Sequence, residues 1–196
     1  MHEFVCRGHI AAPPVRALDI SKRAYRLGGP LGLWMQLDLV IKLLVLLAMA
    51  NGTPVIAKKV LGELLSSPLD AGITLRDGRR LFGPSKTLRG VAVSLAATTL
   101  TAPALGLAWT TGLLAAVAAM AGDLGSSFTK RRLGFPSSSR AAGLDQIPES
   151  LLPALACKSA LALTAVDIGL LVSLFTIGEV LLSRLLFKMR VRDEPY

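Results

Sequence analysis

A long uncharged run constrains this chain more than any other feature of its sequence. No Asp, Glu, Lys or Arg occurs between Gly90 and Gly122. A helix needs about 20 apolar residues to cross the hydrocarbon layer of a bilayer, so the run is too long for one crossing. Because Pro103, Gly106 and Gly112 interrupt it, it predicts two membrane spans joined by a tight turn near these residues.

Two other segments have the length and composition of membrane spans. Leu31 to Ala50 predicts a first span, in which Asp38 and Lys42 have the spacing of an intrahelical ion pair. Leu151 to Phe187 is again too long for one span, and we expect its break between Ala165 and Gly169. The sequence therefore predicts an all-α, polytopic membrane protein with about five transmembrane helices.

The composition agrees with a membrane protein and narrows its partners. Only 18% of the residues are charged and 52% are hydrophobic, whereas soluble domains are usually about 25% charged. The net charge of +9 is typical of the basic loops of membrane proteins, so we expect no nucleic-acid partner. Cys6 and Cys157 are far apart and form no CxxC motif, which predicts neither a disulfide nor a structural zinc site.

Two long polar loops separate the predicted spans. The loops Ser66–Arg89 and Leu124–Ser150 both carry an excess of Lys and Arg, which places both on the cytosolic side of the cytoplasmic membrane. The first 30 residues are also basic, although five spans would place them outside. Either the charge rule fails there, or the segment lies on the membrane surface, or the span count is wrong by one.

This pattern predicts a simple domain organisation. We expect residues 1–30 to form a basic N-terminal segment of unknown structure, and residues 31–196 to form a single membrane-embedded domain whose polar loops face the cytosol. No apolar stretch followed by a small-residue cleavage site occurs near the N-terminus, so we expect no removable signal peptide.

The uncharged run ends in the segment GDLGSSFTKRRLG, residues 122–134. If the helix continues past Gly122, a carboxylate, two hydroxyls and an ammonium group share one face: Asp123, Ser126, Ser127 and Lys130. A carboxylate suits a metal ion, and hydroxyls and cations suit phosphate oxygens. The alternative is a topology anchor of three basic residues at the membrane surface, but an anchor needs no acid deeper in the membrane than its cations. We expect Arg132, which lies off this face, to act only as an anchor.

A second polar segment, DGRRLFGPSKTLRG at residues 77–90, is rich in glycine and basic residues. Such a loop suits a polyphosphate, although a solvated basic loop against anionic lipid remains an alternative. Two earlier polar residues, Asn51 after the first span and Asp70 in PLDAG, are expected at the same membrane face. We expect five residues of this region to bind a polyphosphate: Asn51, Asp70, Lys86, Thr87 and Arg89.

A third segment, SSSRAAGLDQIPE, adds Asp145 and Glu149 just before the fourth span. Asp145 could be a simple helix N-terminal acid. However, Asp123 and Asp145 flank one loop, so their carboxylates can meet in space. Two carboxylates together with substrate phosphates are a common way to hold Mg²⁺.

Five segments resemble, in order, the conserved blocks of the CDP-archaeol synthase family: NGTPV, PLDAG, DGRRLFGPSKTLRG, GDLGSSFTKRRLG and GLDQIPE. The resemblance covers about residues 50–150. It implies a five-span, Mg²⁺-dependent enzyme that condenses CTP with a membrane lipid phosphate, of the archaetidic or phosphatidic acid type, and releases pyrophosphate. Residues 31–196 would then be its single catalytic domain, with the active site facing the cytosol, and the polyphosphate bound by the five residues above would be CTP.

The resemblance also implies roles for individual residues. Asp123 and Asp145 match the acids that hold the metal, and Lys130 and Arg131 match a basic pair that contacts phosphates. Lys86 and Arg89 match the cations of a nucleotide-binding loop. The usual Asp-x-x-Asp spacing is one residue longer here, which makes Glu149 the second acid of that block and a further candidate metal ligand.

The residues fit this chemistry without the family. A lipid phosphate is already an anion near neutral pH, so its attack on CTP needs no general base, and the only histidines, His2 and His9, lie outside the motifs. Two alternatives remain open. A CDP-alcohol phosphotransferase would need further aspartates at a fixed spacing after Asp77-Gly78, and these are absent. A non-catalytic lipid-binding or transport protein would show no CTP-dependent turnover.

Overall fold

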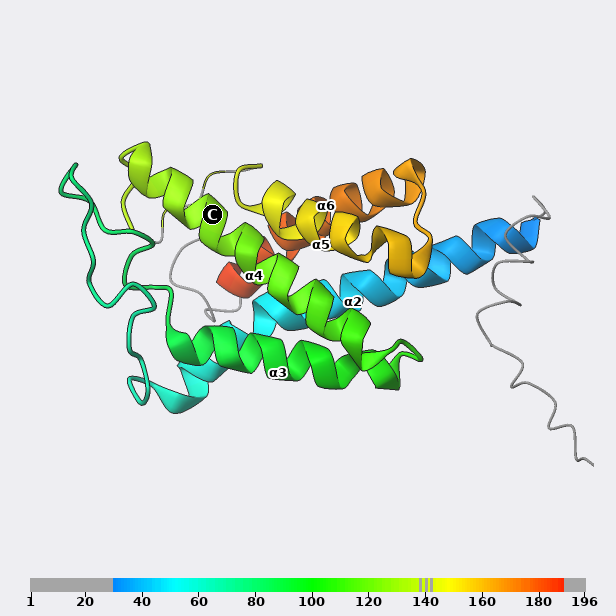
Figure 1. Ribbon diagram of the computed structural model, residues 1–196, viewed down its shortest axis with the longest axis horizontal. Helices are drawn as coiled ribbons and strands as arrows, with labels where there is room; N and C mark the ends of the chain where they lie inside the picture. Colours follow the sequence, from blue (N-terminus) through cyan, green and yellow to red (C-terminus); the bar gives the residue numbers. More distant parts are fainter. Residues whose placement is uncertain (1–29, 138, 140, 142, 189–196) are drawn as a thin grey trace, which may run out of the picture. The chain divides into compact units, whose positions relative to one another are not determined.

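A computed structural model describes residues 30–188 except 138, 140 and 142. The chain divides into residues 1–35 and residues 36–196, and the second unit contains nearly all of the described residues. The helices are α2 (Pro30–Leu61), α3 (Leu88–Ala104), α4 (Trp109–Arg132), α5 (Gln146–Leu161) and α6 (Ala165–Lys188) (Figure 1). In the described part, β structure is limited to two isolated bridges, so the all-α prediction is confirmed.

Three helices are long and apolar enough to cross a membrane: Gln36–Leu61, Trp109–Arg132 and Ala165–Leu182. The other two are shorter, since α3 has 17 residues and α5 has 16. At 1.5 Å per residue, each is about 25 Å long, slightly less than the hydrocarbon layer. The structure therefore supports an integral membrane protein, while five crossings remain a prediction. The predictions for residues 1–29, which include Cys6 and both histidines, and for the C-terminal tail from 189 lie outside the described residues.

The predicted hairpin within the uncharged run is present. α3 ends at Ala104 and α4 begins at Trp109, and Gly106 has a φ of 73° in the connection, which glycine adopts without strain. Gly112 lies directly against α3, because a Cβ at this position would be 2.6 Å from the Cβ of Ala102. The two helices pack closely because small residues line their contact.

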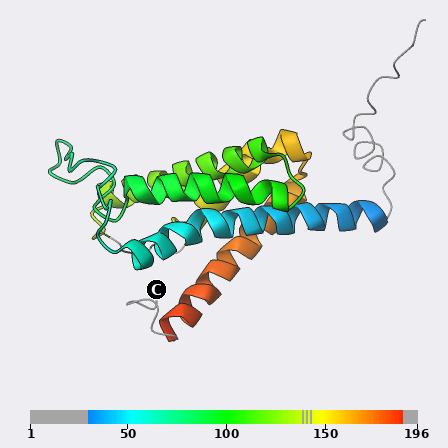
Figure 2. The same cartoon turned by 90° about the horizontal axis from the view of Figure 1, so that it is seen from below.

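The predicted end of the first span was wrong. We expected it at Ala50, but α2 continues to Leu61 and includes Pro54. Proline lacks the N–H that would bond to the carbonyl four residues earlier. Ser94 of α3 replaces it, because its Oγ donates to the Ala50 carbonyl oxygen at 2.8 Å. Figure 2 shows α2 and α3 side by side, and this bond helps join them. Asn51 therefore lies inside a helix and not after one.

The predicted break in the last apolar segment lies slightly earlier than expected. α5 ends at Leu161 and α6 begins at Ala165. Ala162 adopts the left-handed conformation, and Asp167 accepts hydrogen bonds from the backbone N–H and the hydroxyl of Thr164 at 2.8 and 2.6 Å. Because the Asp167 backbone N–H also bonds to the Thr164 hydroxyl, the two residues form a reciprocal cap that starts α6.

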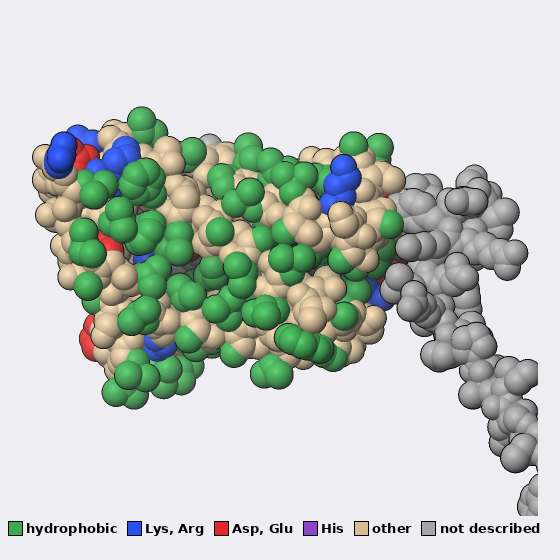
Figure 3. Space-filling model, in the orientation of Figure 1, with side chains coloured by type: hydrophobic (Ala, Val, Ile, Leu, Met, Phe, Trp, Pro, Cys, Tyr) green, Lys and Arg blue, Asp and Glu red, His purple; other side chains and the backbone are tan. Residues whose placement is uncertain are grey.

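The core lies between the helices and the apolar outer surface suits lipid. α2 contributes Leu43, Leu46 and Leu47, which are fully buried, and α6 contributes Leu171 and Phe175. Small residues of α3, α4 and α5 complete the same cluster. In Figure 3 hydrophobic side chains cover much of the visible helical surface, while charged side chains lie mainly towards its ends. Exposed apolar side chains of this extent are typical of a surface that faces lipid.

Candidate functional site

The polar face predicted at the end of the uncharged run exists as a helical face. α4 continues without interruption past Gly122 to Arg132, which confirms the condition on which the face depended. Ser126, Ser127 and Lys130 are buried, with exposed fractions of 2, 4 and 8%, and Asp123 is mostly buried, with its side chain 20% exposed. These polar groups therefore face the protein and not the lipid.

Asp123 is the centre of a charged cluster built from separate segments. Lys86, in the loop before α3, places its Nζ 2.5 Å from both carboxylate oxygens of Asp123. Glu149, in the first turn of α5 and 6% exposed, forms a side-chain hydrogen bond with Asp123. Glu179 of α6 interacts electrostatically with Glu149. Four segments thus bring one cation and three acids together.

A glycine makes this cluster possible. A Cβ at Gly122 would overlap the carbonyl oxygen of Pro148 and would lie 2.8 Å from the backbone nitrogen of Glu149. The backbone of α4 therefore lies directly against the first turn of α5. Since Asp123 follows Gly122 in the chain, this close approach brings the Asp123 and Glu149 carboxyl groups into contact.

The second predicted metal ligand, Asp145, has its own lysine. Lys130 Nζ lies 2.7 Å from Asp145 Oδ1 as an ion pair that lacks the angle of a hydrogen bond, and it donates to the Ser139 carbonyl oxygen at 2.9 Å. The other Asp145 oxygen accepts from the Ala141 backbone N–H at 3.1 Å. Asp145 occupies the N-cap position of α5 but makes no capping hydrogen bond there. Its carboxylate is thus directed to Lys130 and the loop, unlike that of a simple helix N-terminal acid.

Asp70 organises the loop that carries Lys86. The Asp70 side chain is buried and accepts hydrogen bonds from the backbone N–H groups of Gly72, Phe82 and Gly83 and from Arg80. Burial alone would raise its pKa, but these donors more than offset burial and lower the pKa of Asp70 to about 2. In this structure the charged carboxylate therefore holds the loop together.

Two other residues predicted to bind the nucleotide make structural contacts. Thr87 caps α3, because its Oγ1 accepts from the Gly90 backbone N–H at 3.1 Å. Arg89 is buried and donates to the carbonyl oxygens of Gly62 and Leu64 just after α2. These contacts join the end of α2 to the start of α3. Asn51 is partly buried within α2, and its Nδ2 has no hydrogen-bond partner among the described residues.

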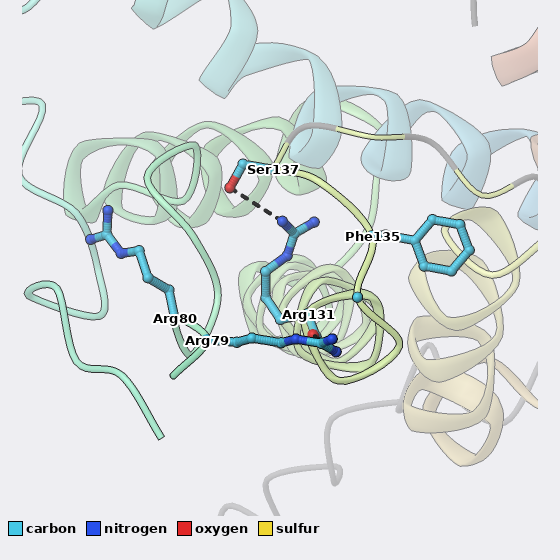
Figure 4. A pocket seen from close by; sticks show the side chains of 6 residues that line it. Arg79, Arg80, Arg131, Phe135 and Ser137 are labelled. Atoms are coloured by element: carbon cyan, nitrogen blue, oxygen red, sulfur yellow. Dashed lines mark hydrogen bonds between the residues drawn. The ribbon is translucent and has the colours of Figure 1, made fainter. Parts of the chain in front are cut away.

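Arginines line a small pocket at the end of α4. Its volume is about 210 Å³, and it is lined by Arg79, Arg80, Arg131, Gly134, Phe135 and Ser137. Figure 4 shows Arg131 pointing toward Ser137, to whose Oγ it donates at 3.3 Å. The Nε of Arg131 is buried and has no hydrogen-bond partner in the described part of the chain. The guanidinium of Arg80 is paired with Asp70, and that of Arg79 donates to the carbonyl oxygens at the end of α4. A pocket lined by three arginines favours an anion such as a phosphate.

Arg132 is more than the anchor that we expected. Its guanidinium lies 2.5 Å from Asp77 Oδ2 and also donates to the carbonyl oxygens of Arg79 and Arg80. In return Arg79 donates to the carbonyl oxygens of Arg131 and Arg132. The end of α4 and the loop before α3 therefore hold each other in place, 52 to 55 residues apart in sequence.

The sequence analysis missed Glu179. It is a single acid in an apolar helix, and no motif surrounds it. Its signal was its position, because an ionisable residue at membrane depth is functional by default.

Among the described residues, no group of three or more His, Cys, Asp or Glu side chains is arranged to hold a metal ion.

The chain is similar in sequence to a known protein family. A family model described as CarS-like CDP-archaeol synthase matches residues 35–196. The CDP-archaeol synthase of Pyrococcus furiosus is 45% identical over 107 residues, which are 50% of this chain and 60% of that relative. The CDP-archaeol synthase of Pyrobaculum calidifontis is 37% identical over 155 residues, 75% of this chain and 90% of that relative.

A solved structure has a similar fold. It is described as an intramembrane enzyme for archaeal membrane lipid biosynthesis, and it superimposes with a TM-score of 0.55 at 32% identity. The superposition covers 69% of this chain and 89% of the other. The similarity therefore extends from the motifs to the arrangement of most of the helices.

Proposed function

Because this chain belongs to the CDP-archaeol synthase family, we infer that it is a CTP-dependent cytidylyltransferase that forms a CDP-activated lipid in membrane lipid biosynthesis. The reaction joins CTP to a lipid phosphate. The match over residues 35–196 favours this reaction over a CDP-alcohol phosphotransferase or a non-catalytic lipid-binding protein. The relatives' name points to an archaeol-type lipid phosphate as the acceptor.

The observation that carries this proposal is the cluster around Asp123. Lys86, Asp123 and Glu149 come from a loop and two helices and meet in a largely buried place. Burying such groups is costly unless they are paired, and a bundle of apolar helices does not need them for its stability. Their retention at the polar end of the membrane helices supports a catalytic role.

The donor chemistry fits Mg²⁺. Asp123 and Asp145 are the candidate ligands, with Glu149 beside Asp123 as a further one, and Mg²⁺ would take one or two of these carboxylates, because it commonly completes its shell with water and substrate phosphates. A site of this kind needs no cluster of three close acids. When bound, the ion would neutralise phosphate charge and stabilise the leaving pyrophosphate.

The remaining residues bind and orient the anions. An oxygen of the lipid phosphate attacks the α-phosphorus of CTP, the new P–O bond forms, and the bond to the β-phosphate breaks as pyrophosphate leaves. Lys130 and Arg131 bind phosphates. For Arg131 this role is supported by the pocket that it lines together with two other arginines. Lys86 binds the nucleotide, and the hydroxyls of Ser126 and Ser127 orient the phosphate oxygens. No proton has to be removed from the nucleophile, which is already an anion.

The loops favour a cytosolic site. The loop that carries Lys86 and the end of α4 that carries Lys130 lie at the same end of the helices (Figure 1), and both are rich in Lys and Arg. Positive charge of this kind is retained on the cytosolic side. CTP is a cytosolic nucleotide, so the same orientation gives the site access to it.

The experiment is a direct assay. Protein purified in detergent is incubated with labelled CTP, Mg²⁺ and a panel of lipid phosphates that differ in ether-linked isoprenoid or ester-linked acyl chains. We expect labelled CDP-lipid and an equal amount of pyrophosphate, with the ether-linked lipid preferred. Lack of a labelled lipid with every acceptor would contradict the proposed function.

A further inference from the structure

The two aspartates assigned to the metal are each paired with a lysine assigned to phosphate. Lys86 contacts Asp123, and Lys130 contacts Asp145. The same ammonium groups are thus needed in two places during the reaction. The lysine side chains of both pairs are mostly buried, with exposed fractions of 24 and 10%, so neither pair is a solvated surface contact.

A metal ion at Asp123 competes with Lys86 for the carboxylate. Lys86 Nζ lies 2.5 Å from both oxygens of this carboxylate, and Mg²⁺ binds a carboxylate oxygen at about 2.1 Å. Both cations on one carboxylate would lie within a few ångström of each other and would repel in a partly buried site. Binding of a metal ion to Asp123 therefore favours displacement of Lys86.

The situation at Asp145 is similar. One oxygen faces Lys130 and the other accepts a backbone N–H, so a metal ion must displace one of these groups. Lys130 is the easier of the two groups to displace, because it is a flexible side chain. Its ammonium group would still have the Ser139 carbonyl oxygen as an acceptor. The Ala141 N–H belongs to the backbone of the loop.

We propose that Lys86 and Lys130 are exchangeable counter-ions that make this site bind metal and nucleotide together. A dication alone would leave displaced lysines without an anion, and a triphosphate alone would compete with the aspartates for the lysines. When both arrive, the metal takes the aspartates and the lysines take the phosphates, so the charges compensate. The proposal rests on the proposed function and adds to it a coupling between two ligands of the same site.

The test measures metal binding and not turnover. Mn²⁺, as a spectroscopic substitute for Mg²⁺, is titrated into the full-length protein in detergent, and free Mn²⁺ is followed by electron paramagnetic resonance with and without CTP. The Mn²⁺ that CTP binds by itself is measured in a protein-free titration and subtracted, which leaves the Mn²⁺ bound to the protein. No lipid phosphate is added, so no reaction occurs. We expect weak Mn²⁺ binding to the wild type, tightened about 10- to 100-fold by CTP, the usual range for coupled ligands.

Lysine variants separate the exchange from simple charge attraction. Lys86→Met and Lys130→Met should each bind Mn²⁺ without CTP about tenfold more tightly than the wild type, because an aspartate is released from its lysine. In both variants CTP should then tighten Mn²⁺ binding less. Lys86→Arg keeps a cation beside Asp123, so its Mn²⁺ binding without CTP should stay weak. Lys58→Met removes an exposed lysine of α2 and serves as the matched control for the loss of one positive charge.

Two results overturn the proposal. The first is that a lysine-to-methionine variant binds Mn²⁺ no more tightly than Lys58→Met. The second is that CTP does not change Mn²⁺ binding to the wild-type protein. If Lys86→Met does not elute as a folded protein, Lys130→Met decides by the same criterion. A wild type that makes CDP-lipid but fails these tests leaves the proposed function standing. A wild type that makes no CDP-lipid contradicts the function and the exchange together.

Discussion

The ammonium group of Lys86 lies 2.5 Å from both carboxylate oxygens of Asp123, 37 residues further along the chain. This contact joins the basic loop before α3 to the polar end of α4. It makes the loop part of the same site as the helical face, and it means that any ligand of Asp123 also acts on Lys86.

Gly122 should be essential for the geometry of the site. Gly122→Ala places a methyl group against the Pro148 carbonyl oxygen, so α4 and α5 must separate, which we expect to cost about 1 to 3 kcal/mol of stability. The separation should also move Asp123 away from Glu149 and lower kcat. Thermal unfolding and CDP-lipid formation measure the two effects.

Gly125→Ala is the matched control for that substitution. A Cβ at Gly125 meets nothing within 4 Å, and alanine favours the helix by about 1 kcal/mol relative to glycine. This variant should be as stable as the wild type or more stable, and fully active. Equal loss of activity in both variants would show that the close contact with Pro148 is not the cause.

Ser94 should stabilise the protein mainly because of Pro54. Ser94→Ala removes the donor to the Ala50 carbonyl and leaves a buried acceptor unsatisfied, at a cost of about 1 to 3 kcal/mol. Pro54→Ala restores a backbone N–H that can take its place. The double variant should therefore lose less stability than Ser94→Ala alone, as measured by chemical unfolding in detergent. Additive losses would contradict this explanation of the long α2.

Asp70 should make the loop sensitive to acid. Its pKa is lowered from 3.8 to about 2 in the folded protein, so its contribution to stability is fully present above about pH 4 and is lost as the pH falls toward 2. The shift corresponds to about 2 kcal/mol. Asp70→Asn should lose this stability at neutral pH and flatten the dependence of unfolding temperature between pH 2 and 4. Unchanged pH dependence in Asp70→Asn would assign the acid sensitivity to other groups.

Substitution of Arg132 should mainly loosen the loop before α3, whereas substitution of Lys130 should mainly stop turnover. Arg132→Ala removes contacts to Asp77 and to the backbone of the loop, so residues 76–80 should be cleaved faster by trypsin while CTP still binds, more weakly. Lys130→Ala should abolish turnover without increasing cleavage. If Arg132→Ala leaves the cleavage rate unchanged, its contacts do not hold the loop in solution.

The sequence predicted local features well and long-range contacts poorly. The α3–α4 hairpin followed from Pro103 and Gly106, and the polar face of α4 followed from helical spacing. The length of α2 could not be predicted, because the hydrogen bond that compensates for Pro54 comes from Ser94, 44 residues away from its acceptor. Periodicity carries no information on such a contact.

The same limit applies to the site. Asp123, Asp145 and the basic residues stood out because charge beside an apolar run is unusual. The pairing of Asp123 with Lys86 and of Asp145 with Lys130 depends on how the loops fold back. The contacts by which Asp70 holds its loop could not be predicted either, because backbone partners are invisible in a sequence. Glu179 was missed because a lone acid has no spacing to interpret. The roles of these residues in binding CTP and metal remain predictions.

The most direct test of the central claim is CDP-lipid formation by Asp123→Asn and Asp145→Asn, measured with labelled CTP at limiting Mg²⁺ beside the control Asp38→Asn, an exposed acid of α2. Each site variant should remain folded and lose at least about 100-fold in turnover, equivalent to about 2.7 kcal/mol of transition-state stabilisation, while the control keeps wild-type activity. Wild-type turnover in Asp123→Asn would contradict the claim that the Lys86–Asp123 cluster is the catalytic site.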